Sequence, residues 1–139
     1  MNEKSVKPLL IAGVALLVLL IFKNFDYSDV NYSEKPTIMR IWVTNTGDKP
    51  ITPEMTSTME SFMDAAIEFG CISAIFADDN ERAIAFTIWP NKETLDVFKK
   101  SKPYEANVDR VLAAFVSAGF EFPGDILFNT DVKILSFVD

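Results

Sequence analysis

The chain has 139 residues, with 13 Lys+Arg against 20 Asp+Glu, no histidine and one cysteine. This acidic balance disfavours binding to nucleic acid or to an anionic lipid surface. The missing histidines exclude imidazole bases, histidine-containing triads, histidine metal ligands and histidine ligation of haem, and a single cysteine excludes an internal disulfide.

The first feature along the chain is an apolar run at residues 8–22, fifteen uncharged residues between Lys7 and Lys23. As a helix it spans about 23 Å, less than the roughly 30 Å hydrocarbon core of a bilayer. The residues at its C-terminal end, from Phe22 to Asp26, are mostly bulky or charged and contain no small-x-small cleavage site. We therefore expect a short tail at residues 1–7 and an uncut transmembrane signal anchor in the lipid bilayer at residues 8–22, with flanking lysines that snorkel. A cleaved signal peptide and a buried helix are the alternatives.

Residues 23–36 alternate aromatic and polar side chains without helical or strand periodicity, which indicates a tether. Lysines on the two sides of the anchor compete in setting its orientation. We expect a single-pass membrane protein with the N-terminus inside and the C-terminal domain extracytoplasmic. From Pro36 onward the chain has nine Lys+Arg and sixteen Asp+Glu, so residues 37–139, the size of one domain, contain the whole net charge of −7.

The domain begins with a predicted strand at Thr37–Thr44, rich in Ile, Val and Trp. Thr52-Pro53-Glu54 then supplies a capping hydroxyl, a first-turn proline and an acidic residue, which predict the start of a helix. Apolar residues follow at helical spacing until Gly70 ends the helix.

Cys71–Ala77 and Arg82–Trp89 are apolar segments joined by an acidic turn, and this pattern predicts a hairpin. A short helical turn from Asn91 and a second amphipathic helix from Ser101 to Gly119 follow. In the remaining tail, Ile126–Phe128 and Val132–Val138 are predicted strands, with residues 129–131 as a bend between them.

The element order is therefore β-α-β-β-α-β, which predicts an α+β, ferredoxin-like antiparallel sheet with two helices on one face, preceded by a single transmembrane helix. The open face of the sheet would expose Ile84, Phe86 and Ile88, and such a patch usually marks an interface. We expect a homodimer formed through this face. Arg40 and Trp42 are assigned to the same dimer contact.

Residues 69–115 contain four features that together resemble a known family. A Gly70-Cys71 pair opens the second strand, Thr87-Ile88-Trp89 ends the third, Asn91 starts a helix, and Ser101-Lys102-Pro103-Tyr104 precedes the long helix. Over about residues 37–139 the chain is similar to the antibiotic-biosynthesis-monooxygenase type of dimeric α+β barrel. That family includes cofactor-free oxygenases acting on polycyclic phenols, haem-degrading enzymes and domains of unknown role.

The haem-degrading branch uses an asparagine near the end of the first strand, a tryptophan at the end of the third, and a histidine on the long helix. Asn45 and Trp89 fall on the first two positions, while Val108 occupies the third. Because the chain has no histidine, the resemblance gives little support to haem degradation.

Asn45 and Trp89 are the candidate catalytic residues. By strand parity both are expected to face the space between sheet and helices, where Asn45 would polarise a carbonyl and Trp89 would flank a ring. A structural role is the alternative, in which Asn45 stabilises a turn before Gly47 and Trp89 fills the core. The expected substrate pocket consists of Ala85, Thr87, Met59, Met63, Tyr104 and Val108.

Two functions are compatible with these observations. The first is a membrane-tethered homodimer that binds or oxidises a lipophilic aromatic or quinone-like ligand, with no cofactor and no metal. The second is a noncatalytic accessory subunit of a larger membrane complex that docks through the open sheet face. The acidic turn at residues 78–81 lacks the glycine and distal glutamate of an EF-hand loop. The sequence alone does not establish catalysis.

Overall fold

The computed structural model describes residues 35–138. Within this part of the chain, no helix combines the length and the apolar character needed to span a membrane. The tail expected at residues 1–7, the anchor expected at residues 8–22 and most of the tether expected at residues 23–36 lie outside the described residues.

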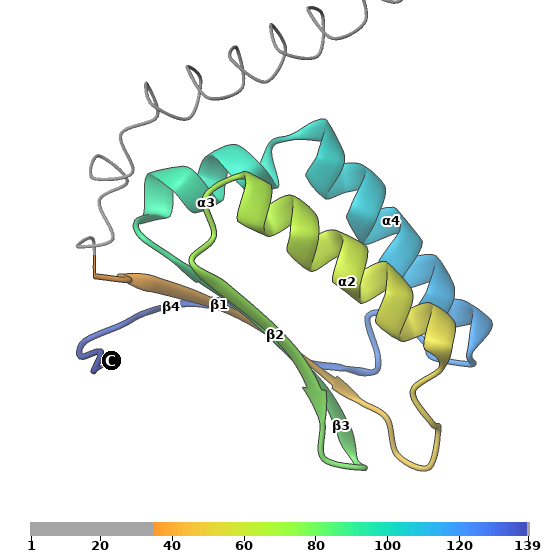
Figure 1. Cartoon of the computed structure of the whole chain (residues 1–139). Coiled ribbons are helices and arrows are strands. Elements are labelled where there is room, and N and C mark those ends of the chain that lie inside the picture. Colours follow the sequence, from red (N-terminus) through yellow and green to blue (C-terminus); the bar gives the residue numbers. More distant parts are fainter. Residues whose placement is uncertain (1–34, 139) are drawn as a thin grey trace, which may run out of the picture. The chain divides into compact units, whose positions relative to one another are not determined.

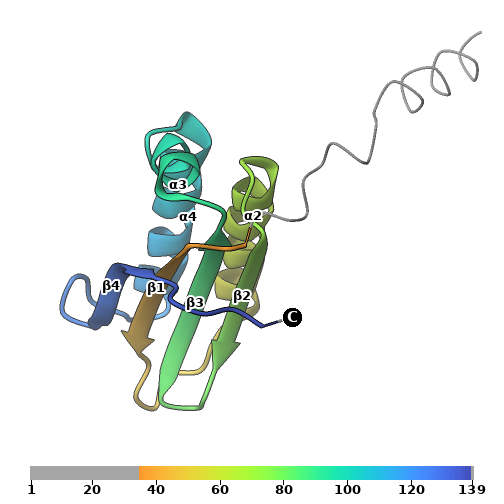
Figure 2. The same ribbon diagram turned by 90° about the vertical axis from the view of Figure 1, so that its left-hand side faces the viewer.

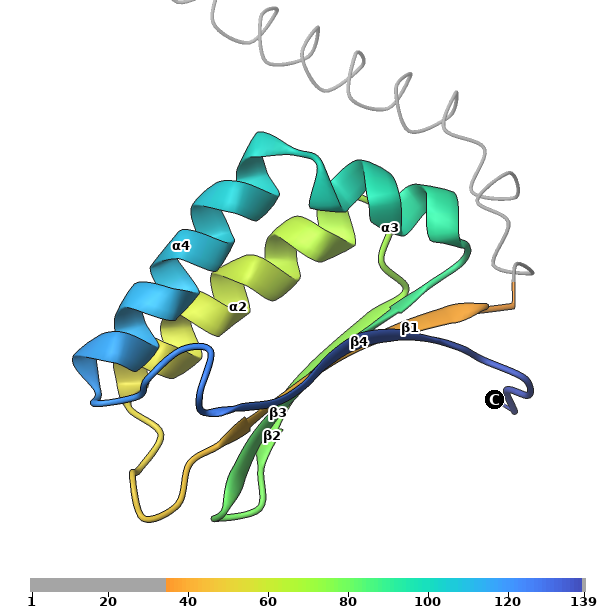
Figure 3. The same ribbon diagram turned by 180° about the vertical axis from the view of Figure 1, so that it is seen from behind.

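Four strands form one antiparallel sheet in the order β2-β3-β1-β4. Figure 2 shows these strands from β4 at the left to β2 at the right. Three helices cover one face of the sheet, as Figure 1 and the reverse view in Figure 3 both show. The elements in chain order are β1 (Ile38–Asn45), α2 (Pro53–Glu68), β2 (Ser73–Asp78), β3 (Arg82–Trp89), α3 (Lys92–Lys99), α4 (Lys102–Ser117) and β4 (Ile126–Lys133).

This order and topology are those of the ferredoxin-like fold, which the sequence predicted. The short helix α3 is an addition between β3 and α4. Residues 134–138 follow β4 on the side of the sheet away from the helices, and Ile134 N donates to Thr37 O at 2.8 Å.

The helices begin where the sequence places capping residues. The side-chain oxygens of Thr52, Asn91 and Ser101 each accept a hydrogen bond from the backbone N–H three residues later, at 3.2, 2.8 and 3.2 Å. Each bond satisfies an N–H that has no partner within its helix. After α2 and α4, Gly70 and Gly119 adopt positive φ angles of 102° and 93°, which only glycine reaches without strain.

The two faces of β1 are the reverse of the sequence-based expectation. Trp42 lies on the helix side, where its ring stacks on Phe115 of α4 at a centroid distance of 5.7 Å. Arg40 shares that face, and the alternate residues, including Asn45, lie on the other. The error arose because the alternate residues on the open face are mostly apolar, whereas the helix side of this strand includes the charged Arg40. The register resolves the ambiguity by placing the large indole of Trp42 opposite the small side chain of Ala85.

The bend expected at residues 129–131 is absent, and β4 runs through this segment without interruption. Asn129 and Asp131 are typical turn residues, but here their side chains are on one face of the strand and both accept hydrogen bonds from Arg40. A long-range contact thus overrides a local turn preference.

Two groups of buried side chains form the core between sheet and helices. The first includes Met55, Met59 and Phe115, and the second includes Trp89 and Phe98. Phe62 of α2 packs against both groups. The packing is incomplete where the two groups meet, and the candidate site lies there.

Candidate functional site

A cavity of about 170 Å³ lies between the sheet and helices α2 and α4. It is partly open to the surface and is lined by side chains from both core groups, with Trp42 and Ala85 contributed by the sheet and Phe62 and Tyr104 by the helices. Among residues 35–138, its lining is Arg40, Trp42, Phe62, Ala85, Phe86, Thr87, Tyr104, Val108, Val111, Leu112, Ile126 and Asn129. Most of these residues are apolar, so the cavity suits an apolar ligand.

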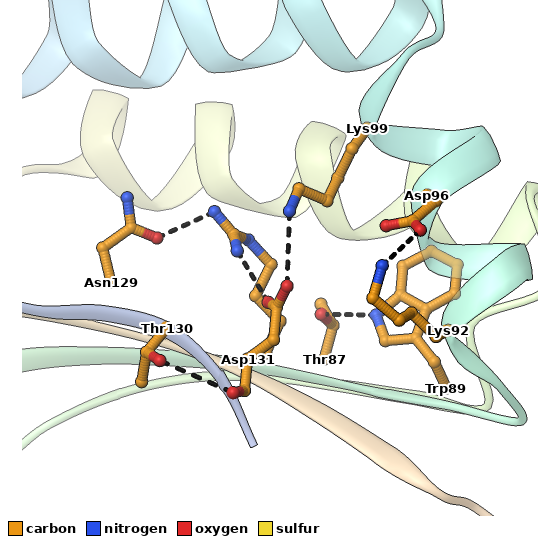
Figure 4. Close-up of polar contacts among 9 residues, drawn as sticks. Thr87, Trp89, Lys92, Asp96, Lys99, Asn129, Thr130 and Asp131 are labelled. Atoms are coloured by element: carbon orange, nitrogen blue, oxygen red, sulfur yellow. Dashed lines mark hydrogen bonds and ion pairs between the residues drawn. The ribbon is translucent and has the colours of Figure 1, made fainter. Parts of the chain in front are cut away.

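One edge of the cavity is polar. Arg40 Nη1 donates to Asp131 Oδ1 at 2.7 Å, and Arg40 Nη2 donates to Asn129 Oδ1 at 2.8 Å. Figure 4 shows Asn129 and Asp131 turned toward the same guanidinium. The Arg40 side chain is only 18% exposed, so its charge lies largely out of solvent at the cavity edge.

Lys99 of α3 completes this polar edge, since its Nζ lies 3.3 Å from Asp131 Oδ2. Burial alone would raise the pKa of the Asp131 carboxyl, but hydrogen bonds and charge from Arg40 and Lys99 lower the pKa overall. Asp131 is therefore ionised at neutral pH and shared between two cations.

Trp42 contributes a further polar group. Its indole Nε1 is buried and has no hydrogen-bond acceptor among the described residues. An unpaired buried donor costs about 1–3 kcal/mol. Trp42 therefore both lines the cavity and leaves a buried donor without an acceptor among the described residues.

The expected pocket residues divide into two groups. Ala85, Thr87, Tyr104 and Val108 line the cavity. Two methionines of α2 do not: Met59 is fully buried in the first core group, and Met63 packs against that group. The role of the four lining residues in binding a substrate stays a prediction.

Asn45 and Trp89 are not brought together. Asn45 is exposed, pairs with Arg82 across the sheet, and accepts from Gly47 N at 3.1 Å, as a turn-stabilising residue does. Trp89 is fully buried, stacks on Phe98 and donates from Nε1 to Thr87 Oγ1 at 2.7 Å. Arg82 and Trp89 are seven residues apart on β3, about 23 Å at ~3.3 Å per residue. Asn45 and Trp89 therefore cannot contact the same small ligand in this structure.

The residues assigned to a dimer interface lie on both faces of the sheet. Ile84, Phe86 and Ile88 have the parity of the open face, as expected. Arg40 and Trp42 lie on the helix side and line the cavity, so their assignment to a contact through the open face is wrong. Dimer formation itself stays a prediction.

Cys71 is buried, and its Sγ donates to the carbonyl oxygens of Ser73 and Ile88 at 3.0 and 3.3 Å. Burial raises the pKa of this thiol, and the two backbone hydrogen bonds oppose the rise without cancelling it. Among residues 35–138, no group of three or more His, Cys, Asp or Glu side chains is placed to hold a metal ion.

Sequence reasoning missed Arg40, Trp42 and Asn129 as cavity residues. A usable signal was present in the size of the β3 side chains. Ala85 is small and lies on the helix side, so a large neighbour such as Trp42 on the paired strand would be accommodated there. No comparable local signal identified Asn129, because its position depends on Arg40, which is 89 residues away in the chain.

No protein-family model matches the chain, and no curated protein matches it. Among solved structures, a provisionally assigned antibiotic biosynthesis monooxygenase from Chloroflexus aurantiacus J-10-fl is similar with a TM-score of 0.51 and 10% identity, over 74% of this chain and 97% of that one. SnoaB, a cofactor-independent oxygenase from Streptomyces nogalater, has a TM-score of 0.51 and 7% identity, over 76% of this chain and 97% of its own. At such identities the similarity concerns the fold alone, which is the ferredoxin-like fold of these monooxygenase-like proteins.

Proposed function

We propose that this domain binds a small lipophilic aromatic or quinone-like compound in the cavity between the sheet and helices α2 and α4, and that it acts as a cofactor-independent oxygenase on that compound. The observation that carries the proposal is the apolar cavity of about 170 Å³ with a polar edge at Arg40 and Asn129. The names of the two similar structures support the oxygenase part.

The cavity volume limits the ligand. An apolar protein cavity of about 150 Å³ is large enough to bind benzene. The space here therefore accommodates one aromatic ring, and a larger compound must extend through the cavity mouth. Because Trp42 and Phe62 supply flat aromatic surfaces in the wall, a planar ring is favoured over a branched aliphatic chain.

The wall and the polar edge can perform different parts of the chemistry. Apolar side chains remove water from the bound ring and hold it in place, while the Arg40 guanidinium and the Asn129 amide can bind an oxygen substituent. In the proposed reaction a ring methylene becomes a carbonyl. One oxygen atom of O₂ forms the carbonyl, and the other leaves as water with the two methylene hydrogens. The substrate itself supplies the electrons.

The location of this chemistry is also part of the proposal. An anchor at residues 8–22 would hold the cavity near lipid-dissolved substrates, which suits a lipophilic ring. The proposed arrangement is a single-pass membrane protein with the domain on the extracytoplasmic side.

A second candidate function rests on the open face of the sheet. Ile75 on β2 is 44% exposed and Phe128 on β4 is 60% exposed, and both have the parity of Ile84 and Phe86. An apolar surface of this kind is typical of an interface. It favours a homodimer or an accessory subunit that docks on a membrane protein.

The test uses the purified full chain and 4-methylphenol as a neutral ring. Binding is followed by ligand-observed NMR, with Ala85→Leu as the variant whose cavity is filled. Oxygen uptake above the uncatalysed background is then measured with anthrone-type substrates, which carry the ring methylene that the proposed reaction oxidises. Saturable binding that Ala85→Leu abolishes supports the cavity as the site. Binding without oxygen uptake would refute the oxygenase part and favour a binding or accessory role, and no saturable binding would refute the ligand site.

A further inference from the structure

The polar edge of the cavity leaves hydrogen-bond donors available while its acceptors are already occupied. Asn129 Oδ1 and Asp131 Oδ1 accept from Arg40, and Asp131 Oδ2 accepts from Lys99. A guanidinium has five N–H donors, and only two donate to acceptors within the described residues. Because Oδ1 of Asn129 accepts from Arg40, the amide nitrogen is left to donate, and Figure 4 shows it turned away from that contact. A ligand group at this edge must therefore be an acceptor.

The charge at this edge indicates which kind of acceptor fits. Arg40 is the one charged residue among the twelve that line the cavity, and no carboxylate from the described part of the chain lines it. Arg40 and Lys99 together carry one positive charge more than Asp131 can neutralise. Since the Arg40 side chain is only 18% exposed, solvent screens its charge poorly. This local excess of positive charge stands out in a chain whose net charge is −7.

A second donor on the same strand face also has no acceptor. Trp42 follows Arg40 by two residues, so both side chains point to the helix side of β1. The buried Nε1 of Trp42 has no partner among the described residues. Arg40 and Trp42 are both cavity-lining residues, and a ligand oxygen would offer either of them an acceptor.

From these contacts we propose that the ligand carries an anionic oxygen, a carboxylate or a phenolate, on a single apolar ring, and that Arg40 is the residue that selects it. The inference rests on the proposed ligand site in the cavity. Asp131 holds the guanidinium in place, and the ligand oxygen accepts from the remaining N–H donors of Arg40. The negative charge of Asp131 beside this site weakens binding of the anion, while Lys99 partly neutralises that charge.

The test compares charged and neutral rings of equal size on the purified full chain. Benzoate is paired with benzamide, and 4-nitrophenolate with 4-nitrotoluene, each titrated by ligand-observed NMR. We expect at least one anion to bind about tenfold more tightly than its neutral counterpart, and the pair that shows the preference identifies the carboxylate or the phenolate as the favoured group. Added salt should reduce the preference, because the attraction is electrostatic.

Three variants test whether Arg40 itself, rather than the total charge of the protein, produces the preference for anionic rings. Arg40→Met should remove the preference, because it should weaken binding of the anions far more than binding of the neutral rings. Arg110→Met removes the same charge from an exposed position on α4 that does not line the cavity, so it should leave the preference intact. Asp131→Asn should strengthen binding of the anion several-fold, because the negative charge beside the site is gone. A merely structural role for the Arg40–Asp131 pair would instead make both Arg40→Met and Asp131→Asn weaken all binding.

The outcomes distinguish this inference from the proposed function. If neutral rings bind as tightly as anions and Ala85→Leu abolishes both, the cavity is a ligand site and the inference about charge is refuted. If Arg40→Met leaves the preference unchanged, Arg40 is not the selecting residue. If no ring binds, the ligand site and the inference fail together.

Discussion

Filling the cavity at Ala85 is the most direct way to test whether the space between sheet and helices binds a ligand. Ala85 lies on the helix side of β3, opposite Trp42, and lines the cavity. Replacement by leucine adds three methyl or methylene groups, and about 170 Å³ is sufficient to accommodate them. At about 0.8 kcal/mol for each buried group, the gain is about 2.4 kcal/mol. Ordering the leucine side chain costs about 0.5–1 kcal/mol of this gain.

The net expectation for Ala85→Leu is an increase of about 1.5 kcal/mol in the free energy of unfolding. For a domain of about one hundred residues this corresponds to a rise in Tm of roughly 6–12 °C. Urea denaturation followed by circular dichroism measures the stability, and NMR titration with 4-methylphenol measures the binding. We expect higher stability and lost binding in the same variant.

The matched control is Ala77→Leu, since Ala77 is exposed and lies on the open face of the sheet, opposite Ile84. It introduces the same side chain into the neighbouring strand without entering the cavity, so binding should be unchanged. A close-packed site has no room for leucine, and overpacking costs about 1–3 kcal/mol. A loss of stability of that size in Ala85→Leu would show that the space beside Ala85 cannot hold a leucine, and retained binding of 4-methylphenol would show that the ligand binds elsewhere.

Three further predictions concern groups outside the cavity wall. Because the pKa of Asp131 is lowered in the fold, its carboxylate stabilises the protein above the ordinary aspartate pKa of about 3.9, and this stabilisation is lost as pH falls through the lowered folded value. The free energy of unfolding should therefore fall less steeply with acidification in Asp131→Asn than in the unmodified chain. An unchanged dependence on acid pH would contradict the contact with Arg40. The Cys71 thiol, buried and with a raised pKa, should react with a thiol reagent at neutral pH far more slowly in the native protein than in urea, and equal rates would show that it is accessible. Thr52→Ala removes the cap of α2 and should lower the free energy of unfolding by about 1 kcal/mol, while Thr52→Ser, which keeps the hydroxyl, should not.

The fold was predictable because its signals are local. The caps at Thr52 and Ser101 and the glycines at 70 and 119 delimit both long helices, and the alternation of small and large side chains on β3 assigned its faces correctly. Each of these signals depends on residues within a few positions of one another. The order of the strands in the sheet then follows from the fold class.

The candidate site was less predictable because its contacts are long-range. The local sequence of β1 is more apolar on the open face than on the helix side, which includes Arg40, so the orientation of the strand depends on cross-strand packing against Ala85. Asn129 and Asp131 are turn residues by composition, and their place in a strand depends on a guanidinium about ninety residues earlier. The position of a strand residue such as Asn45 relative to Trp89 likewise follows only from the antiparallel register.

The position of Arg40 explains both the unexpected orientation of β1 and the absence of the bend expected at residues 129–131. When its side chain is placed on the helix side of β1, the polar residues of β4 gain a partner and the strand needs no bend. The same placement brings a cation to the edge of an apolar cavity, where it is costly unless it is paired. Asp131 supplies that pairing with one carboxylate, but Lys99 shares the carboxylate, so the two cations are only half neutralised. The contact that keeps β4 continuous through residues 129–131 is therefore also the one that leaves the cavity able to attract an anionic oxygen.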